Sequence, residues 1–183
     1  MNVITTELEG LVVIEPRVFE DQRGYFMESF LDHKFRDMVS DTLFVQDNES
    51  KSDYGVIRGL HFQMPPFAQA KLVRVVSGKV WDVAVDIRKG SPTYGQHVGV
   101  ELSSENKRQV FIPKGFAHGF SVLSETAILQ YKCDSYYKPE SEKAIAWNDP
   151  TLNIEWKIPI ENIILSEKDK RNPSFKEISD ILK

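Results

Sequence analysis

The sequence lacks the cysteines that a disulfide framework needs. It has one, Cys133, in 183 residues, and a single thiol cannot form an internal disulfide. Its apolar run at residues 11–14 is too short for a signal peptide or a membrane span, and no basic segment precedes it. These absences predict a cytoplasmic protein.

An excess of positive charge is also absent. The chain has 23 Lys+Arg against 27 Asp+Glu, a net charge of -4, so it has no general attraction for nucleic acid or for a membrane surface. Any phosphate that it binds must be held by local side chains. The length and a hydrophobic content of 41% predict one domain over residues 1–183.

Short runs of alternating apolar and polar residues fill the middle of the chain and predict strands. They lie at residues 11–15, 25–30, 43–48, 72–76, 80–87, 98–102, 110–112 and 126–131. This spacing predicts an all-β sandwich or barrel. Residues 77–78 and 103–106 have the chemistry of hairpin turns.

Helical patterns occur only near the edges of this region. Residues 32–39 have helical spacing, and Ser174 with Glu177 forms a capping box ahead of an apolar tail. Pro150 and Pro159 mark the passage into the C-terminal segment of about 40 residues. We expect that segment to wrap the barrel.

Two side chains in predicted strands are candidates for proton chemistry. His61 can take and return protons near neutral pH, although a hydrogen-bonded structural histidine is the alternative. Lys71 shares a strand face with Val73 and Val75. Because a buried, unpaired ammonium is costly, it lies either at the wet end of its strand or toward a cavity with an anionic partner.

Two aspartates share one face of the next predicted strand. If the turn at residues 77–78 pairs this strand with the preceding one, Asp82 can pair with Lys71 or Arg74. Asp86 is interpreted as part of the solvent face.

Tyr131 and Cys133 lie in register on a later strand. Tyr131 can donate or accept a proton, and the alternative is an aromatic ring that fills the barrel. We interpret Cys133 as an inert buried thiol, since nothing local lowers its pKa.

Residues 111–120 contain Pro113, Gly115 and His118 in a pattern that resembles the second motif of the cupin superfamily. Metal-binding cupins have a His-x-His pair in the first motif, whereas this chain has His61 followed by Gln63 at the second position. Two histidines without a third strong donor make a poor zinc or iron site. The pattern therefore predicts a cupin scaffold used without a metal.

Five blocks in the same order along nearly the whole chain resemble the dTDP-4-dehydrorhamnose 3,5-epimerase family: residues 19–24, 45–48, 57–63, 112–120 and 165–169. The resemblance implies a cupin-type jelly-roll barrel with a few short peripheral helices. It also implies an enzyme without a cofactor, acting in dTDP-L-rhamnose biosynthesis. Such an enzyme inverts carbons 3 and 5 of dTDP-4-dehydro-6-deoxy-D-glucose to give dTDP-4-dehydro-L-rhamnose.

The same resemblance implies roles for particular residues. His61 is the general base, Asp169 orients it, Lys71 stabilises the enolate, and Tyr131 is the acid on the opposite face. The residues implied to hold the nucleotide-linked sugar are Phe19, Arg23, Glu28, Gln46, Asp47, Asn48, Arg58, His118, Tyr137, Glu142 and Lys168.

The family resemblance further implies a homodimer that exchanges N-terminal strands, with residues 23–48 serving the pocket of the partner. Arg58 and His61 have opposite parity in a regular strand. Both can face a ligand only if Gly59 introduces a bulge or the strand bends.

Three alternatives stay open from the sequence. One is a mono-epimerase or ketoisomerase on a related nucleotide-linked 4-keto-6-deoxy sugar. Another is a sugar-binding cupin without turnover. The presence of an acid, a base and a cation together argues against it, because a binding protein does not need them. The third is a metal-dependent oxygenase, which Gln63 disfavours.

Overall fold

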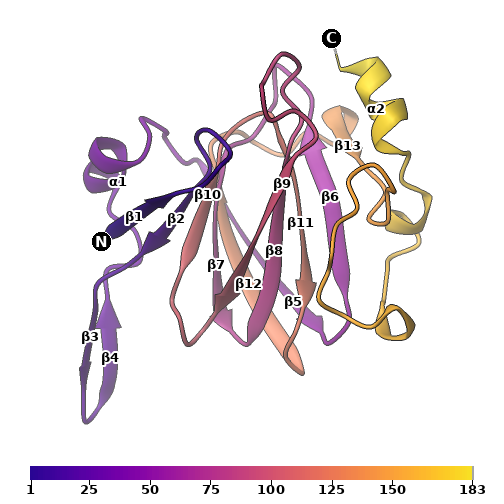
Figure 1. Ribbon diagram of the computed structural model, residues 1–183. Helices are drawn as coiled ribbons and strands as arrows, with labels where there is room; N and C mark the ends of the chain where they lie inside the picture. The colour runs from indigo at the N-terminus through magenta and orange to yellow at the C-terminus, as the bar shows by residue number, and fades with distance from the viewer. Residues whose placement is uncertain (183) are drawn as a thin grey trace.

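A computed structural model describes residues 1–182. These residues form two antiparallel sheets packed face to face (Figure 1). The larger sheet has the strand order β1-β2-β10-β7-β12-β5 and the smaller one β13-β6-β11-β8-β9, while β3 and β4 form a separate hairpin. The predicted all-β fold of cupin type is confirmed.

The strands of the larger sheet are β1 (Asn2–Thr5), β2 (Val12–Glu15), β10 (Gln109–Ile112), β7 (Lys71–Ser77), β12 (Thr126–Cys133) and β5 (Gln46–Asp53). Those of the smaller sheet are β13 (Glu142–Ala144), β6 (Ile57–Gln63), β11 (Phe116–Val122), β8 (Lys79–Asp86) and β9 (His97–Ser103). The hairpin consists of β3 (Val18–Asp21) and β4 (Gly24–Met27). The helices are α1 (Asp32–Met38) and α2 (Phe175–Ile181), with short 3-10 turns at Pro139–Ser141, Ile160–Asn162 and Asp169–Arg171.

Strand alternation builds two separate apolar layers. Val73 of β7 and Val80 of β8 point into the space between the sheets, where both are fully buried. The next residues of opposite parity, Val83 and Val85, face the other side of the smaller sheet. There the C-terminal segment covers them, with Trp156 and the helix α2 residues of the same cluster.

Helix α2 begins as the sequence predicts. The Ser174 side chain accepts a hydrogen bond from the Glu177 backbone N–H, and the Glu177 carboxylate accepts one from the Ser174 backbone, so the capping box is complete. Phe175 and Ile178 are buried, and they anchor the helix to the outer layer of the smaller sheet. No helix in the part of the chain that the structure describes is long and apolar enough to cross a membrane.

The two turns predicted as hairpins have a different role. The turn at Gly78 leads from β7 in the larger sheet to β8 in the smaller one, and the turn after Ser103 leads back from β9 to β10. The hairpin prediction is therefore wrong at both turns. Gly78 has φ +79°, and a Cβ there would lie 2.1 Å from the Thr126 carbonyl oxygen, so this corner requires glycine.

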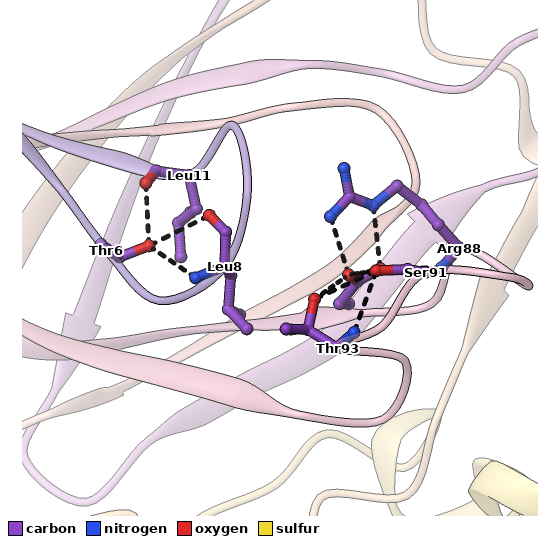
Figure 2. Close-up of polar contacts among 7 residues, drawn as sticks. Thr6, Leu8, Leu11, Arg88, Ser91 and Thr93 are labelled. Carbon is purple, nitrogen blue, oxygen red and sulfur yellow. Dashed lines mark hydrogen bonds and ion pairs between the residues drawn. The ribbon is translucent and has the colours of Figure 1, made fainter.

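Asp86 does not face solvent, which corrects the interpretation from the sequence. It is 0% exposed and lies where the chain turns after β8. Its carboxylate accepts hydrogen bonds from Arg88 Nε (2.9 Å), Ser91 Oγ (2.6 Å) and Thr93 Oγ1 (2.7 Å). Figure 2 shows the side chains of Arg88, Ser91 and Thr93 close together, with dashed lines for their hydrogen bonds. Burial opposes ionisation, but these bonds hold the pKa of Asp86 well below its usual range.

We expect Asp86→Asn to lower the free energy of unfolding by about 2–4 kcal/mol at pH 7, because it leaves Arg88 without its carboxylate. A carboxyl with a depressed folded-state pKa stabilises the fold above its ordinary pKa and loses that contribution as the pH falls. Urea unfolding should therefore show that the difference in free energy of unfolding between wild type and Asp86→Asn becomes smaller below about pH 4. Asp180→Asn, at an exposed position, is the control. An equal gap at pH 7 and pH 3 would contradict this account.

Candidate active site

Side chains from both sheets meet in the interior of the barrel. In the smaller sheet, His61 of β6 lies opposite His118 of β11, and in the larger sheet Lys71 of β7 lies opposite Cys133 of β12. A small cavity between the sheets is lined by Gln63 and His118 from one side and by Lys71 from the other. Polar side chains thus gather at one place between two otherwise apolar faces.

Of the two ways in which Arg58 and His61 could share a face, a bulge in β6 is present. Arg58 pairs with Phe120 and His61 with His118, so Gly59 and Leu60 together lie opposite the single residue Gly119. Because two residues of β6 lie opposite one residue of β11, the alternation of side chains along β6 is reversed at this point. Arg58 and His61 therefore point to the same face. Leu60, the second residue of the bulge, is fully buried.

His61 is bound to a carboxylate far away in the sequence. Its Nε2 lies 2.6 Å from Asp169 Oδ1, and Asp169 is 4% exposed. Burial opposes ionisation of Asp169, but the hydrogen bonds from His61 and its neighbours lower the pKa of the carboxyl below its usual value. The ionised carboxylate requires a hydrogen on Nε2, which leaves Nδ1 as the basic nitrogen of a neutral ring.

Asp169 is itself held by two side chains that were not predicted. Ser166 Oγ donates to Asp169 Oδ2 at 2.8 Å, and Asn172 Nδ2 donates to Asp169 Oδ1 at 3.2 Å. Ser166 Oγ also accepts from the Asp169 backbone N–H. The Ser-x-x-Asp spacing was the available signal, because a serine three residues before an aspartate suits a local cap of this kind.

A second histidine–aspartate pair lies deeper. His118 Nε2 is 2.9 Å from Asp82 Oδ2, and both side chains are buried. The predicted pairing of Asp82 with Lys71 or Arg74 as neighbours in one sheet is wrong, because β7 and β8 lie in different sheets. The charge of Asp82 still acts on Lys71. Burial lowers the pKa of His118 although Asp82 opposes this, so the ring is neutral near pH 7.

Lys71 and Tyr131 lie together on the larger sheet. The Lys71 Nζ is 5.7 Å from the centroid of the Tyr131 ring. Burial lowers the pKa of Lys71, and the charges of Asp82 and Glu142 oppose that change. Burial raises the pKa of Tyr131, so the phenol keeps its proton at neutral pH. This pair places the Lys71 amine next to a protonated phenol.

A polar rim extends from this cluster. Tyr137 Oη donates to Glu142 Oε2 at 3.0 Å, and Lys168 Nζ binds the same carboxylate oxygen. Gln46 Nε2 donates to Asn48 Oδ1 at 3.0 Å on the inner face of β5. The Tyr137 N–H donates to Gln46 Oε1, so hydrogen bonds join these residues, and Glu142 lies on β13 beside the strand that carries His61.

Four of the predicted site residues lie outside this polar cluster. Asp47 points to the outer face of β5, where its Oδ1 lies 2.9 Å from Lys132 Nζ. Phe19 and Arg23 lie on the β3–β4 hairpin, which projects away from the barrel (Figure 1). Glu28 follows that hairpin, and its Oε1 lies 3.7 Å from Lys34 Nζ.

Gln63 occupies the position of a cupin metal ligand but has another use. Its Oε1 accepts from the Lys138 backbone N–H at 2.6 Å, and its Nε2 donates to the Phe67 carbonyl at 2.7 Å. The amide is thus engaged with loop backbone. Within residues 1–182, no group of three or more His, Cys, Asp or Glu side chains has an arrangement that could hold a metal ion.

Comparison with known proteins identifies the family. Residues 5–177 match the family described as dTDP-4-dehydrorhamnose 3,5-epimerase. The chain belongs to this epimerase family. A dTDP-4-dehydrorhamnose 3,5-epimerase from Shigella flexneri is 55% identical over 176 residues, which is 96% of each chain. The epimerase family predicted from the five sequence blocks is therefore confirmed.

Solved structures of the epimerase family agree with this architecture. The dTDP-4-dehydrorhamnose 3,5-epimerase of Elizabethkingia anophelis NUHP1 is 54% identical with a TM-score of 0.92, and the alignment covers 97% of each chain. A dTDP-6-deoxy-D-glucose-3,5-epimerase from Legionella pneumophila Philadelphia 1, solved in complex with dTDP-4-keto-L-rhamnose, is 50% identical with a TM-score of 0.93. That alignment covers 100% of this chain and 94% of the other.

The thiol of Cys133 should be unreactive in the folded epimerase. It is fully buried, and burial raises its pKa to about 11. We expect iodoacetamide at pH 8 to alkylate the native protein about two orders of magnitude more slowly than the urea-unfolded chain, since only the thiolate reacts. Mass spectrometry over time measures both rates. Similar rates would show that the native thiol is ionised and accessible.

Proposed function

We propose that the protein inverts carbons 3 and 5 of dTDP-4-dehydro-6-deoxy-D-glucose and yields dTDP-4-dehydro-L-rhamnose. The observation that carries the proposal is the His61–Asp169 pair at 2.6 Å, which faces the same interior as Lys71 and Tyr131. A base, a cation and a neutral proton donor together are what the inversion of a carbon next to a ketone requires.

The first step is removal of a proton by His61. Its Nδ1 takes the proton from carbon 3, and the electron pair of the broken C–H bond moves toward carbon 4, whose carbonyl oxygen becomes an enolate. Asp169 stabilises the imidazolium that forms and keeps the ring oriented. The same step, repeated at carbon 5, prepares the second inversion.

Lys71 stabilises the enolate oxygen. Its side chain is only partly exposed, so its field is weakly screened, and a cation placed in advance contributes several kcal/mol in such a site. The neighbouring charges of Asp82 and Glu142 favour the protonated form that this role needs.

Tyr131 returns a proton to the face opposite His61. The two residues come from opposite sheets, so a sugar between them has one on each side. Burial keeps the Tyr131 phenol protonated. When the carbanion takes the phenolic proton and the enolate collapses to the ketone, the configuration at that carbon is inverted. Proton exchange with water then restores both groups.

The rim holds the nucleotide in this proposal. The basic side chains of Arg58 and Lys168 suit the pyrophosphate, and the half-exposed ring of Tyr137 offers a surface for the thymine. His118, Gln46, Asn48 and Glu142 supply the remaining polar contacts. We also place the protein in the cytoplasm, which its single buried thiol supports.

Solvent deuterium exchange tests the chemistry. In D2O, wild-type protein should place deuterium at carbons 3 and 5 of dTDP-4-dehydro-6-deoxy-D-glucose, followed by proton NMR. His61→Ala should lower both exchange rates by about 10³-fold, because it removes the base. Tyr131→Phe should still exchange these protons but should return deuterium largely without inversion.

His97→Ala is the matched control, because His97 lies on β9 opposite Val85, on the outer face of the smaller sheet, and its loss should leave exchange unchanged. Deuterium at only one of the two carbons would show that the protein is a mono-epimerase. Full exchange by His61→Ala would show that another group is the base.

We further propose that the protein is a homodimer in which the β3–β4 hairpin of each subunit reaches the site of the other. The hairpin exposes Phe26 (70%), Tyr25 (53%) and Phe19 (49%), and exposed apolar clusters on a projecting arm are typical of interaction surfaces. Arg23 at its tip contacts only Asp21 among the ion pairs of the described chain. A partner's site would give this guanidinium its pyrophosphate.

Subunit mixing tests this arrangement. If Arg23 serves the opposite site, Arg23→Ala and His61→Ala are each nearly inactive, yet a hybrid dimer contains one intact site. Unfolding and refolding the two together should restore about a quarter of the wild-type rate. Each variant refolded alone is the control, and light scattering checks the dimer mass. No recovery in a mixture shown to contain hybrids would place Arg23 in the site of its own subunit.

A further inference from the structure

A short loop between β12 and the 3-10 turn Pro139–Ser141 is held by glutamine side chains at every residue from 135 to 138. Gln69 Nε2 donates to the Ser135 carbonyl at 2.7 Å. The Tyr137 N–H donates to Gln46 Oε1 at 3.0 Å. Two further backbone groups, the Tyr136 carbonyl and the Lys138 N–H, both bind the amide of Gln63.

These three glutamines come from separate parts of the fold. Gln46 begins β5 in the larger sheet, Gln63 ends β6 in the smaller sheet, and Gln69 precedes β7. The loop is therefore tied to both walls of the barrel at once. We call Gln46, Gln63 and Gln69 the glutamine clamp.

Gln63 is the central member of the glutamine clamp. It is 6% exposed, and its amide accepts one hydrogen bond and donates to both Phe67 and Tyr136 carbonyls, at 2.7 and 3.3 Å. A carboxylate cannot donate these two bonds, and an apolar side chain can make none of the three. Only an amide can make all three hydrogen bonds at this position.

The loop carries Tyr137 to the rim of the candidate active site. The Tyr137 hydroxyl donates to Glu142, which also binds Lys168. Tyr137 is 49% exposed and has little packing of its own to fix its direction. Its placement therefore depends on the backbone of the loop.

We propose that Gln63 and Gln69 are positioning residues that hold Tyr137 ready for the nucleotide of the substrate. This inference rests on the proposed function, in which Tyr137 contacts the base. It assigns to the position of a cupin metal ligand a different task, the ordering of a binding loop. The two residues act on binding and not on proton transfer, because their bonds end at the loop backbone.

Binding and turnover separate this role from a general structural one. Gln63→Met keeps a similar size but removes the hydrogen bonds, and Gln63→Glu keeps only the acceptor. We expect Gln63→Met to raise the Kd for dTDP, measured by calorimetry, and the KM about tenfold, with kcat within about twofold. Gln63→Glu should lie closer to Gln63→Met than to wild type. Gln96→Ala, at an exposed glutamine, should match wild type.

Limited chymotrypsin digestion reports on the loop without any ligand. Tyr136 and Tyr137 are exposed cleavage sites, so release of the loop in Gln63→Met should speed cleavage there at least about tenfold. Gln69→Ala, which removes one bond only, should show smaller changes in the same direction. It also keeps the test valid if Gln63→Met fails to fold.

The outcomes distinguish this inference from the proposed function. Unchanged cleavage and unchanged dTDP binding in both variants would overturn the glutamine clamp as a positioning device. A parallel loss of kcat with no change in KM would also overturn it. If Tyr137→Ala leaves dTDP binding unchanged while Gln63→Met speeds cleavage, the proposed contact of Tyr137 with the base fails, and with it the nucleotide part of this inference.

Discussion

The close approach of β6 and β11 at two glycines is the constraint on which the site depends. A Cβ on Gly59 would lie 2.5 Å from Gly119 Cα, and Gly59 has φ +129°, so neither steric room nor backbone conformation allows a side chain there. The bulge that forms at this point turns Arg58 and His61 to one face. Without it, Arg58, which we propose binds phosphate, and the proposed base would lie on opposite sides of the sheet.

The C-terminal segment completes what this bulge begins. It covers the outer face of the smaller sheet with an apolar layer, and in doing so it brings Asp169 to within hydrogen-bond distance of His61. The free energy that holds the segment in place comes mainly from burial of residues such as Trp156 and Ile178. Orientation of the proposed base is therefore a consequence of packing on the other side of the sheet.

Buried carboxylates have two different uses in this barrel. Asp86 is neutralised by Arg88 and two hydroxyls and joins a loop to β8, which stabilises the fold. Asp82 and Asp169 are each paired with a histidine instead, and imidazoles can exchange protons near neutral pH. The partner of the carboxylate, rather than its depth, separates Asp86 from the two aspartates that face the candidate active site.

The sequence alone determined the strand alternation, the capping box at Ser174 and the family, because these depend on residue types at short spacing or on ordered blocks. It also indicated that Arg58 and His61 need a bulge. Only the tertiary structure decided which strands pair. The turns at Gly78 and Ser103 look like hairpins locally, yet each leads to the other sheet, since a turn does not specify the partner of the strand that follows. The same limit hid the contacts of Asp82 with His118 and of the glutamine clamp with its loop, which join residues far apart in the chain.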